Sequence, residues 1–257
     1  MLRGMYSSIS AMISLEANQK VITNNIANIN TTGYKSETMM YKSFDELLLN
    51  NNEMYINGEG RTQVLGIMNP GVSIDEVVTN HTQGIIKSTE NDSDFAINGK
   101  GFFTIRDNEG NIRYTRDGIF KVNSNGYLVN TSGYNVLGIN QRTNNLEPIY
   151  VGNQKISMDN NNNLLLDSNA AYKFNIVDFE NYGNLKKIGE NLFQGNDAIP
   201  AKNYYIQNRA KETSNVDIID VTTALMSNLR AFEANQKVVQ IMDSTLSKIA
   251  SEIGAVR

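Results

Sequence analysis

The residue types that could catalyse a reaction or bind a metal are scarce in this chain. The sequence has one histidine, His81, in the polar stretch at residues 79–82, and it has no cysteine. A catalytic relay or a thiolate metal site needs several such side chains together. We therefore interpret His81 as a solvated loop residue and expect no enzyme activity.

Three short motifs resemble ligand-binding loops without completing their patterns. The stretch Asn98-Gly99-Lys100-Gly101-Phe102 starts like a dinucleotide loop, but the third glycine is missing and a strand is expected to follow. Residues 107–110 and 159–162 are rich in oxygen ligands, yet they lack the ligand spacing and terminal glutamate of a calcium loop. Turns between strands explain all three motifs. We expect no cofactor, no metal and no small-molecule substrate.

The composition is that of a globular protein. Hydrophobic residues make up 40% and charged residues 19% of the 257 residues, which is too apolar for a disordered chain. The net charge of -4, with acidic and basic residues interspersed, argues against a nucleic-acid partner. No apolar run approaches the ~20 residues that cross a bilayer. Serines near the N-terminus interrupt any signal-peptide core, so export without a cleaved signal is expected if the chain leaves the cytoplasm.

Residues 2–29 are expected to form a helix that carries few charges. Its charged side chains are Arg3, Glu16 and Lys20. A helix solvated along one face normally carries more charge than this, so we expect other protein to surround it. Apolar residues follow helical spacing along it, and they are Leu2, Met5, Ile9, Met12, Leu15, Ile22 and Ile26.

Residues 217–253 are expected to form a second, longer helix. Ser214, Asn215 or Asp217 could cap its start. Residues spaced alternately three and four positions apart form a mostly apolar stripe along this helix. A stripe of this length favours packing against another helix. The stripe comprises Ile218, Val221, Leu225, Leu229, Phe232, Asn235, Val239, Met242, Leu246, Ile249 and Ile253.

The same six residues, Glu-Ala-Asn-Gln-Lys-Val, occur at residues 16–21 and again at residues 233–238. Both copies place an asparagine, Asn18 or Asn235, on the apolar stripe of its helix. An asparagine there costs stability but can set the register of two packed helices. We therefore expect the two terminal helices to pack as a coiled-coil-like pair.

The middle of the chain shows the alternation and turns of antiparallel strands. Hairpins are expected from residues 102–106 with 111–116 and from 119–122 with 127–129. Further strands are expected at residues 149–151, 155–158, 163–166 and 172–178.

The expected fold is α+β, with a central, mostly antiparallel β domain inserted between the paired terminal helices. The expected boundaries are 1–33 for the N-terminal helix, 34–60 for a loop-rich connector, 61–205 for the β domain, 206–216 for a return linker and 217–257 for the C-terminal helix. Within the connector, residues 43–49 could form one short helix.

Three segments resemble the rod, hook and hook-associated proteins of the bacterial flagellum. Residues 24–35, Asn-Asn-Ile-Ala-Asn-Ile-Asn-Thr-Thr-Gly-Tyr-Lys, are similar to the N-terminal signature of that family. Residues 94–138 resemble its central domain, and residues 214–217 and 230–237 resemble its C-terminal signature. The residues singled out for this resemblance are Asn24, Asn25, Asn28, Asn30, Thr31, Gly33, Tyr34, Lys35, Gly99, Gly101, Phe102, Phe103, Glu233, Ala234, Asn235 and Gln236.

The resemblance implies a structural subunit of the flagellar basal-body rod, of either proximal or distal type. It implies export by the flagellar type III apparatus and assembly outside the inner membrane into a helical tube lined by the terminal helices. The implied partners are copies of the chain itself, other rod and hook axial proteins, and the export apparatus.

Two other readings stay open. The chain could be a hook or hook-associated axial protein, or a β-domain binding module on an isolated helical stalk. A stalk would need charged outer positions on its helices, which residues 1–30 lack. A peptidoglycan enzyme would need a carboxylate or cysteine site in the β domain, and the sequence offers no convincing one.

Overall fold

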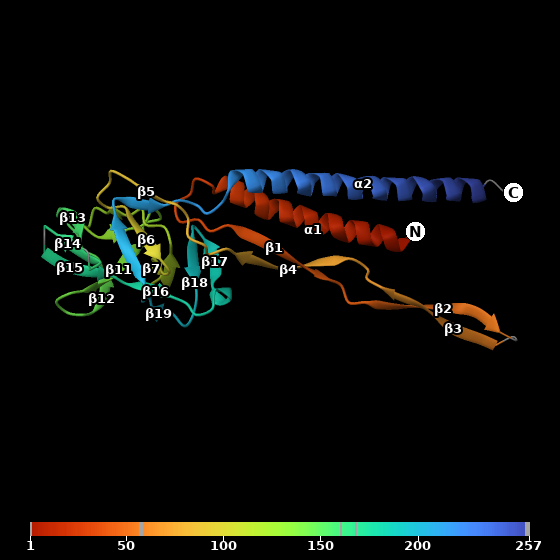
Figure 1. Cartoon of the computed structure of the whole chain (residues 1–257), viewed down its shortest axis with the longest axis horizontal. Coiled ribbons are helices and arrows are strands. Elements are labelled where there is room, and N and C mark those ends of the chain that lie inside the picture. Colours follow the sequence, from red (N-terminus) through yellow and green to blue (C-terminus); the bar gives the residue numbers. More distant parts are fainter. Residues whose placement is uncertain (1, 57–58, 160, 168, 255–257) are drawn as a thin grey trace. The chain divides into compact units, whose positions relative to one another are not determined.

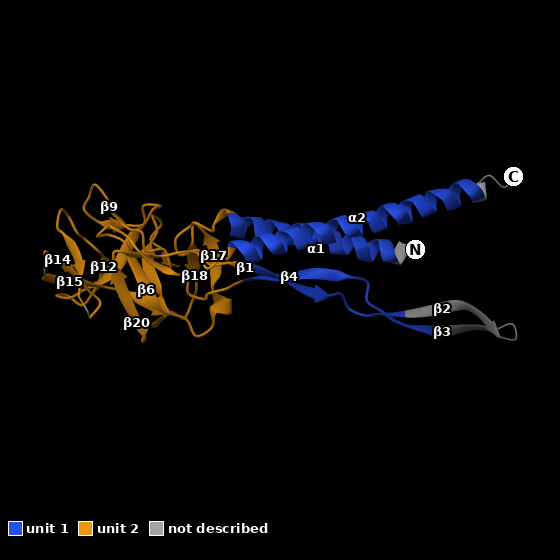
Figure 2. Cartoon of the chain, turned by 45° about the horizontal axis from the view of Figure 1, so that its top comes forward, with its two compact units in different colours: residues 1–26, 37–78, 218–257 blue, residues 27–36, 79–217 orange. Residues whose placement is uncertain are grey.

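The computed structural model describes residues 2–56, 59–159, 161–167 and 169–254. The chain divides into two compact units, shown in Figure 2. Unit 1 contains residues 1–26, 37–78 and 218–257, and unit 2 contains residues 27–36 and 79–217. Each unit therefore brings together segments that are far apart in the sequence.

Unit 1 contains the two terminal helices. Helix α1 spans Leu2–Ala27 and helix α2 spans Ile218–Gly254. They run antiparallel and side by side (Figure 1). The N-terminal and C-terminal helices predicted from the sequence are thus confirmed. In the described part of the chain, no helix combines the length and apolarity that would span a membrane.

A β ribbon, which the sequence analysis did not predict, completes unit 1. Strand β1 (Glu37–Ser43) pairs with β4 (Val72–Thr79), and β2 (Leu47–Ile56) pairs antiparallel with β3 (Glu59–Met68). The ribbon formed by β1 and β4 lies along α1 (Figures 1 and 2). The short helix expected at residues 43–49 is wrong, because β1 ends and β2 begins there. Pairing with a distant strand outweighed the weak local helical pattern.

Unit 2 is built from antiparallel strands, as predicted for the centre of the chain. A large sheet has the strand order β13-β14-β15-β11-β7-β8-β18-β17, and β6 with β20 and β5 with β21 form separate pairs. The strands are β5 Ile86–Ser88, β6 Phe95–Gly99, β7 Phe102–Arg106, β8 Ile112–Thr115, β9 Lys121–Val122, β10 Leu128–Val129, β11 Asn135–Asn140, β12 Leu146–Pro148, β13 Ile156–Met158, β14 Asn163–Leu166, β15 Asn169–Phe174, β16 Ile176–Asp178, β17 Lys186–Gly189, β18 Leu192–Gln194, β19 Ile199–Pro200, β20 Tyr204–Asn208 and β21 Ala210–Glu212. A short 3-10 helix, η1, spans Tyr182–Asn184.

The two predicted hairpins are present. Phe103 of β7 pairs with Thr115 of β8, and Leu128 of β10 pairs with Val122 of β9. The oxygen-rich residues 107–110 form the first turn, where Oδ1 of Asp107 accepts hydrogen bonds from the backbone N–H groups of Glu109 and Asn111. The interpretation of this motif as a turn is therefore confirmed.

Other expected boundaries are wrong. Residues 149–151 form no strand; Tyr150 makes an isolated bridge to Tyr127. The strand expected at 172–178 is divided between β15 and β16. The expected return linker at 206–216 contains most of β20 and all of β21, which pair with β6 and β5. Residues 61–78, expected in the β domain, belong to unit 1. These pairings join distant segments, which local periodicity does not report.

Two aromatic clusters fill unit 2 on opposite faces of β7. Successive side chains of a strand point to opposite faces of the sheet. Phe103 accordingly packs in the larger core, and Phe102 packs in the smaller one. The larger core also holds Phe95, Phe120 and Phe174, and the smaller one holds Tyr114, Phe179 and Phe193.

Candidate functional site

Helices α1 and α2 are joined in unit 1 by hydrogen bonds that involve the half-buried Asn18 and the buried Asn228. Nδ2 of Asn18 donates a hydrogen bond to Oδ1 of Asn228 at 3.1 Å. Nδ2 of Asn228 donates to the carbonyl oxygen of Leu15 at 2.9 Å, and the Asn228 side chain is 5% exposed. Each amide thus has a partner, which offsets much of the cost of burying it.

The two asparagines of the repeated motif make different contacts. Asn18 reaches across to α2, whereas Nδ2 of Asn235 donates to the carbonyl oxygen of Ala231 in its own helix at 2.9 Å. Asn228 was not singled out in the sequence, although it stands three residues after Leu225 and four before Phe232. Position 228 fits the alternating spacing of three and four residues along α2. It was not predicted as a contact residue because asparagine is polar.

The expected stripe on α2 needs a correction near its centre. Asn228 contacts α1, whereas the next residue, Leu229, is partly exposed, as are Ile218 and Ile249. Residues of the stripe that are half-buried are Val221, Leu225, Phe232, Asn235, Val239, Met242 and Leu246. The side chains of Leu2 and Ile253 lie outside the described part of the structure. Successive residues of a helix point about 100° apart. Because Asn228 faces α1, the side chain of Leu229 points away from α1.

The apolar and asparagine residues predicted to face the partner helix on α1 also differ in burial. Ile22 is buried, and Met5, Met12, Leu15, Asn18 and Ile26 are half-buried. Ile9 is partly exposed. At the start of the helix, a Cβ atom on Gly4 would lie 2.9 Å from Cε of Met242, so the two helices approach closely there.

The opposite flank of α1 is held by the β ribbon of unit 1. Oγ of Ser10 donates to the carbonyl oxygen of Val72 at 2.7 Å and accepts from the backbone N–H of Val72 at 3.0 Å. Nδ2 of Asn25 donates to the carbonyl oxygen of Glu37 at 2.7 Å, and Oδ1 of Asn25 accepts from the backbone N–H of Glu37 at 3.0 Å. Asn24 adds a side-chain hydrogen bond to Glu37 at 3.3 Å. Asn24 and Asn25, two of the signature residues, thus fasten the ribbon to the end of α1.

The remainder of the N-terminal signature forms a tight turn in unit 2. Oγ1 of Thr31 donates to Oδ1 of Asn28 at 3.1 Å, and Asn30 is exposed. Gly33 adopts φ +67°, and a Cβ atom there would lie 2.5 Å from the backbone nitrogen of Asp117. Glycine is required at this position by both its backbone conformation and the contact with a neighbouring backbone.

Lys35 is the last residue of this signature, and its side chain belongs to a buried ionic cluster. Its Nζ atom lies 2.6 Å from Oε1 of Glu212 and 2.8 Å from the carbonyl oxygen of Thr82. Nε of Arg116 donates to Oε2 of Glu212 at 2.8 Å. All three ionic side chains are at most 5% exposed. Burial lowers the pKa of Lys35, and the adjacent Glu212 carboxylate opposes that shift.

The ionic cluster explains the glycine motif at residues 98–102. The guanidinium of Arg116 donates hydrogen bonds to the carbonyl oxygens of Ile97, Gly99 and Gly101. Gly101 adopts φ +129°, and a Cβ atom there would lie 2.6 Å from Cγ2 of Ile176. The motif is therefore a backbone cradle for a buried arginine. Sequence analysis missed Glu212, which stands in a stretch without any local motif.

His81 is not the solvated loop residue that its polar neighbours indicated. Its ring stacks on Tyr182 at a centroid distance of 4.9 Å and contacts Phe102 and Phe193. Its buried Nδ1 atom has no hydrogen-bond partner among the described residues. Burial, and then the positive charges of Lys35, Arg116 and Lys187, lower its pKa to about 4. A neutral imidazole in an aromatic pocket has a packing role.

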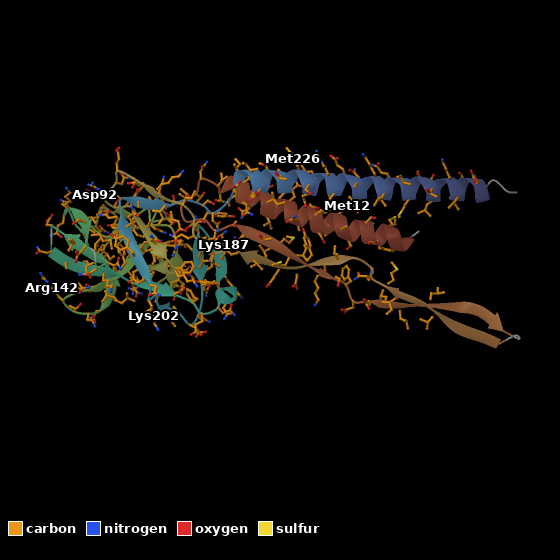
Figure 3. All side chains as sticks on the ribbon, viewed as in Figure 1. Met12, Asp92, Arg142, Lys187, Lys202 and Met226 are labelled. Carbon is orange, nitrogen blue, oxygen red and sulfur yellow. The ribbon has the colours of Figure 1, made fainter. Side chains whose placement is uncertain are left out.

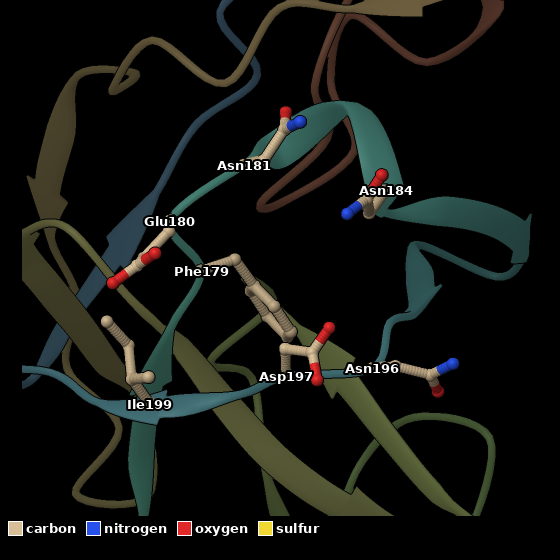
Figure 4. Close-up of a pocket in the computed structure, with 7 residues that line it drawn as sticks. All are labelled: Phe179, Glu180, Asn181, Asn184, Asn196, Asp197 and Ile199. Atoms are coloured by element: carbon tan, nitrogen blue, oxygen red, sulfur yellow. The ribbon is translucent and has the colours of Figure 1, made fainter.

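The described residues contain no cluster of histidine, cysteine, aspartate or glutamate side chains that could hold a metal ion. The hollow in Figure 4 has a volume of about 300 Å³ and lies in unit 2. Its lining combines amides and carboxylates with two apolar residues, and it comprises Phe179, Glu180, Asn181, Asn184, Asn196, Asp197 and Ile199. No nucleophile with an adjacent base is among these lining residues.

The second part of the C-terminal signature, residues 230–237, lies in α2, and its first part, residues 214–217, directly precedes that helix. Glu233, Ala234 and Gln236 are exposed, while Asn235 is half-buried.

Comparison with known proteins gives one consistent result. The family model described as "Flagella basal body rod protein" matches residues 5–35. The model "Flagellar hook protein FlgE/F/G D1 domain" matches residues 96–172, and "Flagellar basal body rod FlgEFG protein C-terminal" matches residues 207–252.

Full-length relatives agree with the family models. The chain is 32% identical over 281 residues to the flagellar hook-basal body complex protein FlhO of Bacillus subtilis, covering 100% of both chains. It is 32% identical over 266 residues to the flagellar basal-body rod protein FlgG of Agrobacterium fabrum, covering 98% of this chain and 100% of the relative. It is also 32% identical to the flagellar basal-body rod protein FlgF of Caulobacter vibrioides, over 96% of each chain. The chain belongs to the flagellar basal-body rod protein family, which is a family of structural proteins and not of enzymes.

Proposed function

We propose that this chain is a structural subunit of the flagellar basal-body rod. In this proposal the flagellar type III apparatus exports it, and it polymerises through its terminal helices into a tubular drive shaft outside the inner membrane. Membership of the rod family supports a place in the basal body. The names of the relatives, which include both rod and hook-basal body proteins, support contacts with other axial proteins.

The observation that carries this proposal is the large apolar side chains left exposed on both helices. On α1, Tyr6 is 65% and Ile13 is 60% exposed. On α2, Ile219, Met226 and Ile241 are each more than 60% exposed, and Figure 3 shows Met226 projecting away from the helix. Burying one such side chain contributes about 1.5–3 kcal/mol. Exposed apolar side chains on both helices, together with the few charges on α1, favour a protein partner.

The partner that we propose for these exposed side chains is the helix pair of another copy of the chain. Within one chain, α1 and α2 would pack in a coiled-coil-like manner, supported by the half-buried positions that recur at steps of three and four along α2. The exposed residues of α1 would then meet α2 of a neighbouring copy. Head-to-tail contacts that do not close produce a helical filament, which is the geometry of a tube.

Electron microscopy of the purified full-length chain tests this proposal. Ile13→Glu and Ile241→Glu place a carboxylate in the proposed contact, where its desolvation opposes association. We expect both variants to form no tubes at concentrations where the wild type forms them. The matched control is Ile85→Glu, which changes a residue of unit 2 that is 71% exposed. Normal tubes from both helix variants, with circular dichroism showing unchanged helix content, would refute assembly through these helices.

A further inference from the structure

Three tyrosines gather on the surface of unit 2. Tyr127 and Tyr150 face each other at a ring-centroid distance of 5.3 Å and an interplanar angle of 73°. Tyr172 and Tyr150 line the same hollow. Tyr150 is 51% exposed. We refer to Tyr127, Tyr150 and Tyr172 as the tyrosine platform.

A hollow opens on each side of the platform, and Tyr150 lines both of them. The first has a volume of about 260 Å³ and is bounded by Tyr172, Asn140, Arg142, Gln154 and Asn169. The second has a volume of about 380 Å³ and is bounded by Asn123, Ser124, Asn125 and Asn153. Arg142 lies at the surface of this end of unit 2 (Figure 3). The two hollows therefore form neighbouring compartments that share one aromatic ring.

The linings of these hollows carry many polar groups and almost no charge, and they also include the apolar residues Leu166, Ala170, Ala171 and Val122. Amides and hydroxyls both donate and accept hydrogen bonds. Among the lining residues of the two hollows, Arg142 supplies a charge and no carboxylate is present. Such a surface does not match a strongly charged ligand. It matches a ligand that carries many hydroxyl and amide groups and also has an apolar face that can stack on tyrosine.

Local backbone contacts hold the platform in place. A Cβ atom on Gly126 would lie 2.8 Å from Cε2 of Tyr150, so the backbone supports that ring directly. Oδ1 of Asn123 accepts hydrogen bonds from the backbone N–H groups of Asn125 and Tyr127, which fixes the turn that precedes Tyr127. A stacking ring with little freedom loses little entropy when a ligand binds.

We propose that the tyrosine platform binds a linear polysaccharide. A sugar ring would stack its C–H face on Tyr150, and the adjacent sugars would occupy the two hollows, where amides would bind their hydroxyl or acetamido groups. The shared ring favours an oligomer over a single sugar, because one unit would fill only one hollow. Most glycoside hydrolases use a pair of carboxyl groups to cleave a glycosidic bond. The lining residues of the two hollows include none, so the role that fits this surface is binding without cleavage.

Titration of the full-length chain with soluble sugar tetramers tests this proposal. The probes are the β-1,4 tetramers of N-acetylglucosamine and of glucose, and isothermal calorimetry measures their affinity. We expect the wild type to bind at least one tetramer more tightly than the matching monosaccharide. Tyr150→Ala should weaken that binding at least tenfold, while Tyr150→Phe should keep it because the ring remains. The matched control is Tyr205→Ala, which removes a tyrosine of β20 that is 46% exposed and lies outside both hollows.

Three results would overturn the proposal. The first is the absence of binding for both tetramers at millimolar concentration. The second is equal binding by Tyr150→Ala and the wild type. The third is a loss of tube assembly in Tyr150→Ala without any sugar binding by the wild type, which would assign the platform to a protein contact. Because the proposal concerns unit 2 alone, its failure would leave assembly through the terminal helices unaffected.

Discussion

Nζ of Lys35 lies 2.6 Å from Oε1 of Glu212, although the two residues are 177 positions apart in the sequence. The same carboxylate accepts a hydrogen bond from Arg116 and another from the backbone N–H of Gly84 at 2.9 Å. One buried anion thus ties together the signature turn after α1, the loop before β5 and the end of β8. The carbonyl oxygens around Lys35 and Arg116 balance the remaining positive charge.

Glu212→Gln is expected to destabilise unit 2 by about 3–5 kcal/mol, because it leaves two buried cations without their anion. Lys35→Met should cost less, since the pair formed by Arg116 and Glu212 remains neutral. Chemical denaturation followed by circular dichroism measures both. The control is Glu90→Gln at an exposed position. A larger loss for Lys35→Met than for Glu212→Gln would contradict this account of the cluster.

Gly33→Ala is expected to destabilise unit 2 strongly. The new Cβ atom would meet the backbone of Arg116 and Asp117 at less than 3 Å, and the residue would also have to adopt φ +67°. Gly110→Ala separates these two effects, because Gly110 has φ +89° and no atom within 4 Å of an added Cβ. The Gly110 variant should lose about 1–2 kcal/mol from backbone strain alone. Equal losses in thermal or denaturant unfolding would show that the close contact at Gly33 contributes nothing.

Asn18 and Asn228 are expected to be energetically coupled. Replacing either one by alanine leaves a half-buried or buried amide without its partner, whereas replacing both removes the mismatch. The double variant should therefore be about 1 kcal/mol more stable than the sum of the single losses implies. Hydrogen exchange of amides in α1 and α2 reports this difference within unit 1. The same cycle with Asn235→Ala should show almost no coupling to Asn18, since Asn235 bonds to its own helix.

Acid is expected to weaken unit 2 through His81. The folded-state pKa of about 4 lies below the ordinary value of 6.5 because of burial. Between these two values the unfolded chain binds more protons at this residue than the folded chain, so its contribution to stability is lost as the pH falls. His81→Phe keeps the aromatic packing and should gain stability relative to the wild type between pH 6.5 and pH 4.

Asp117 opposes this effect in the wild type. Burial raises the pKa of Asp117 to about 6 from an ordinary value of 3.8, so the folded state takes up its proton first and gains stability as the pH falls. Denaturation midpoints of the wild type and of His81→Phe, measured from pH 7 to pH 4, separate the contribution of His81 to stability from that of Asp117. A stability difference between the two proteins that does not change with pH would refute the assignment to His81.

The sequence by itself determined the elements whose signals are local. Helical periodicity located α1 and α2, and turn residues between alternating stretches located the hairpins around residues 107–110 and 123–126. The signature residues around Gly33 and Gly101 identified the family, which the comparisons then bore out. A short stretch of sequence is sufficient for such features, because each depends on contacts between residues a few positions apart.

The tertiary structure alone decided the features that depend on distant partners. The β ribbon of residues 37–78, the burial of His81, the contact of Asn228 with α1 and the role of Glu212 all rest on contacts between segments far apart in the chain. A carboxylate in a polar stretch has the same local pattern whether it is solvated or buried between two cations. Only the folded chain, which brings Lys35 and Arg116 to Glu212, distinguishes the two, because the charge and solvent around a side chain are set by what packs against it.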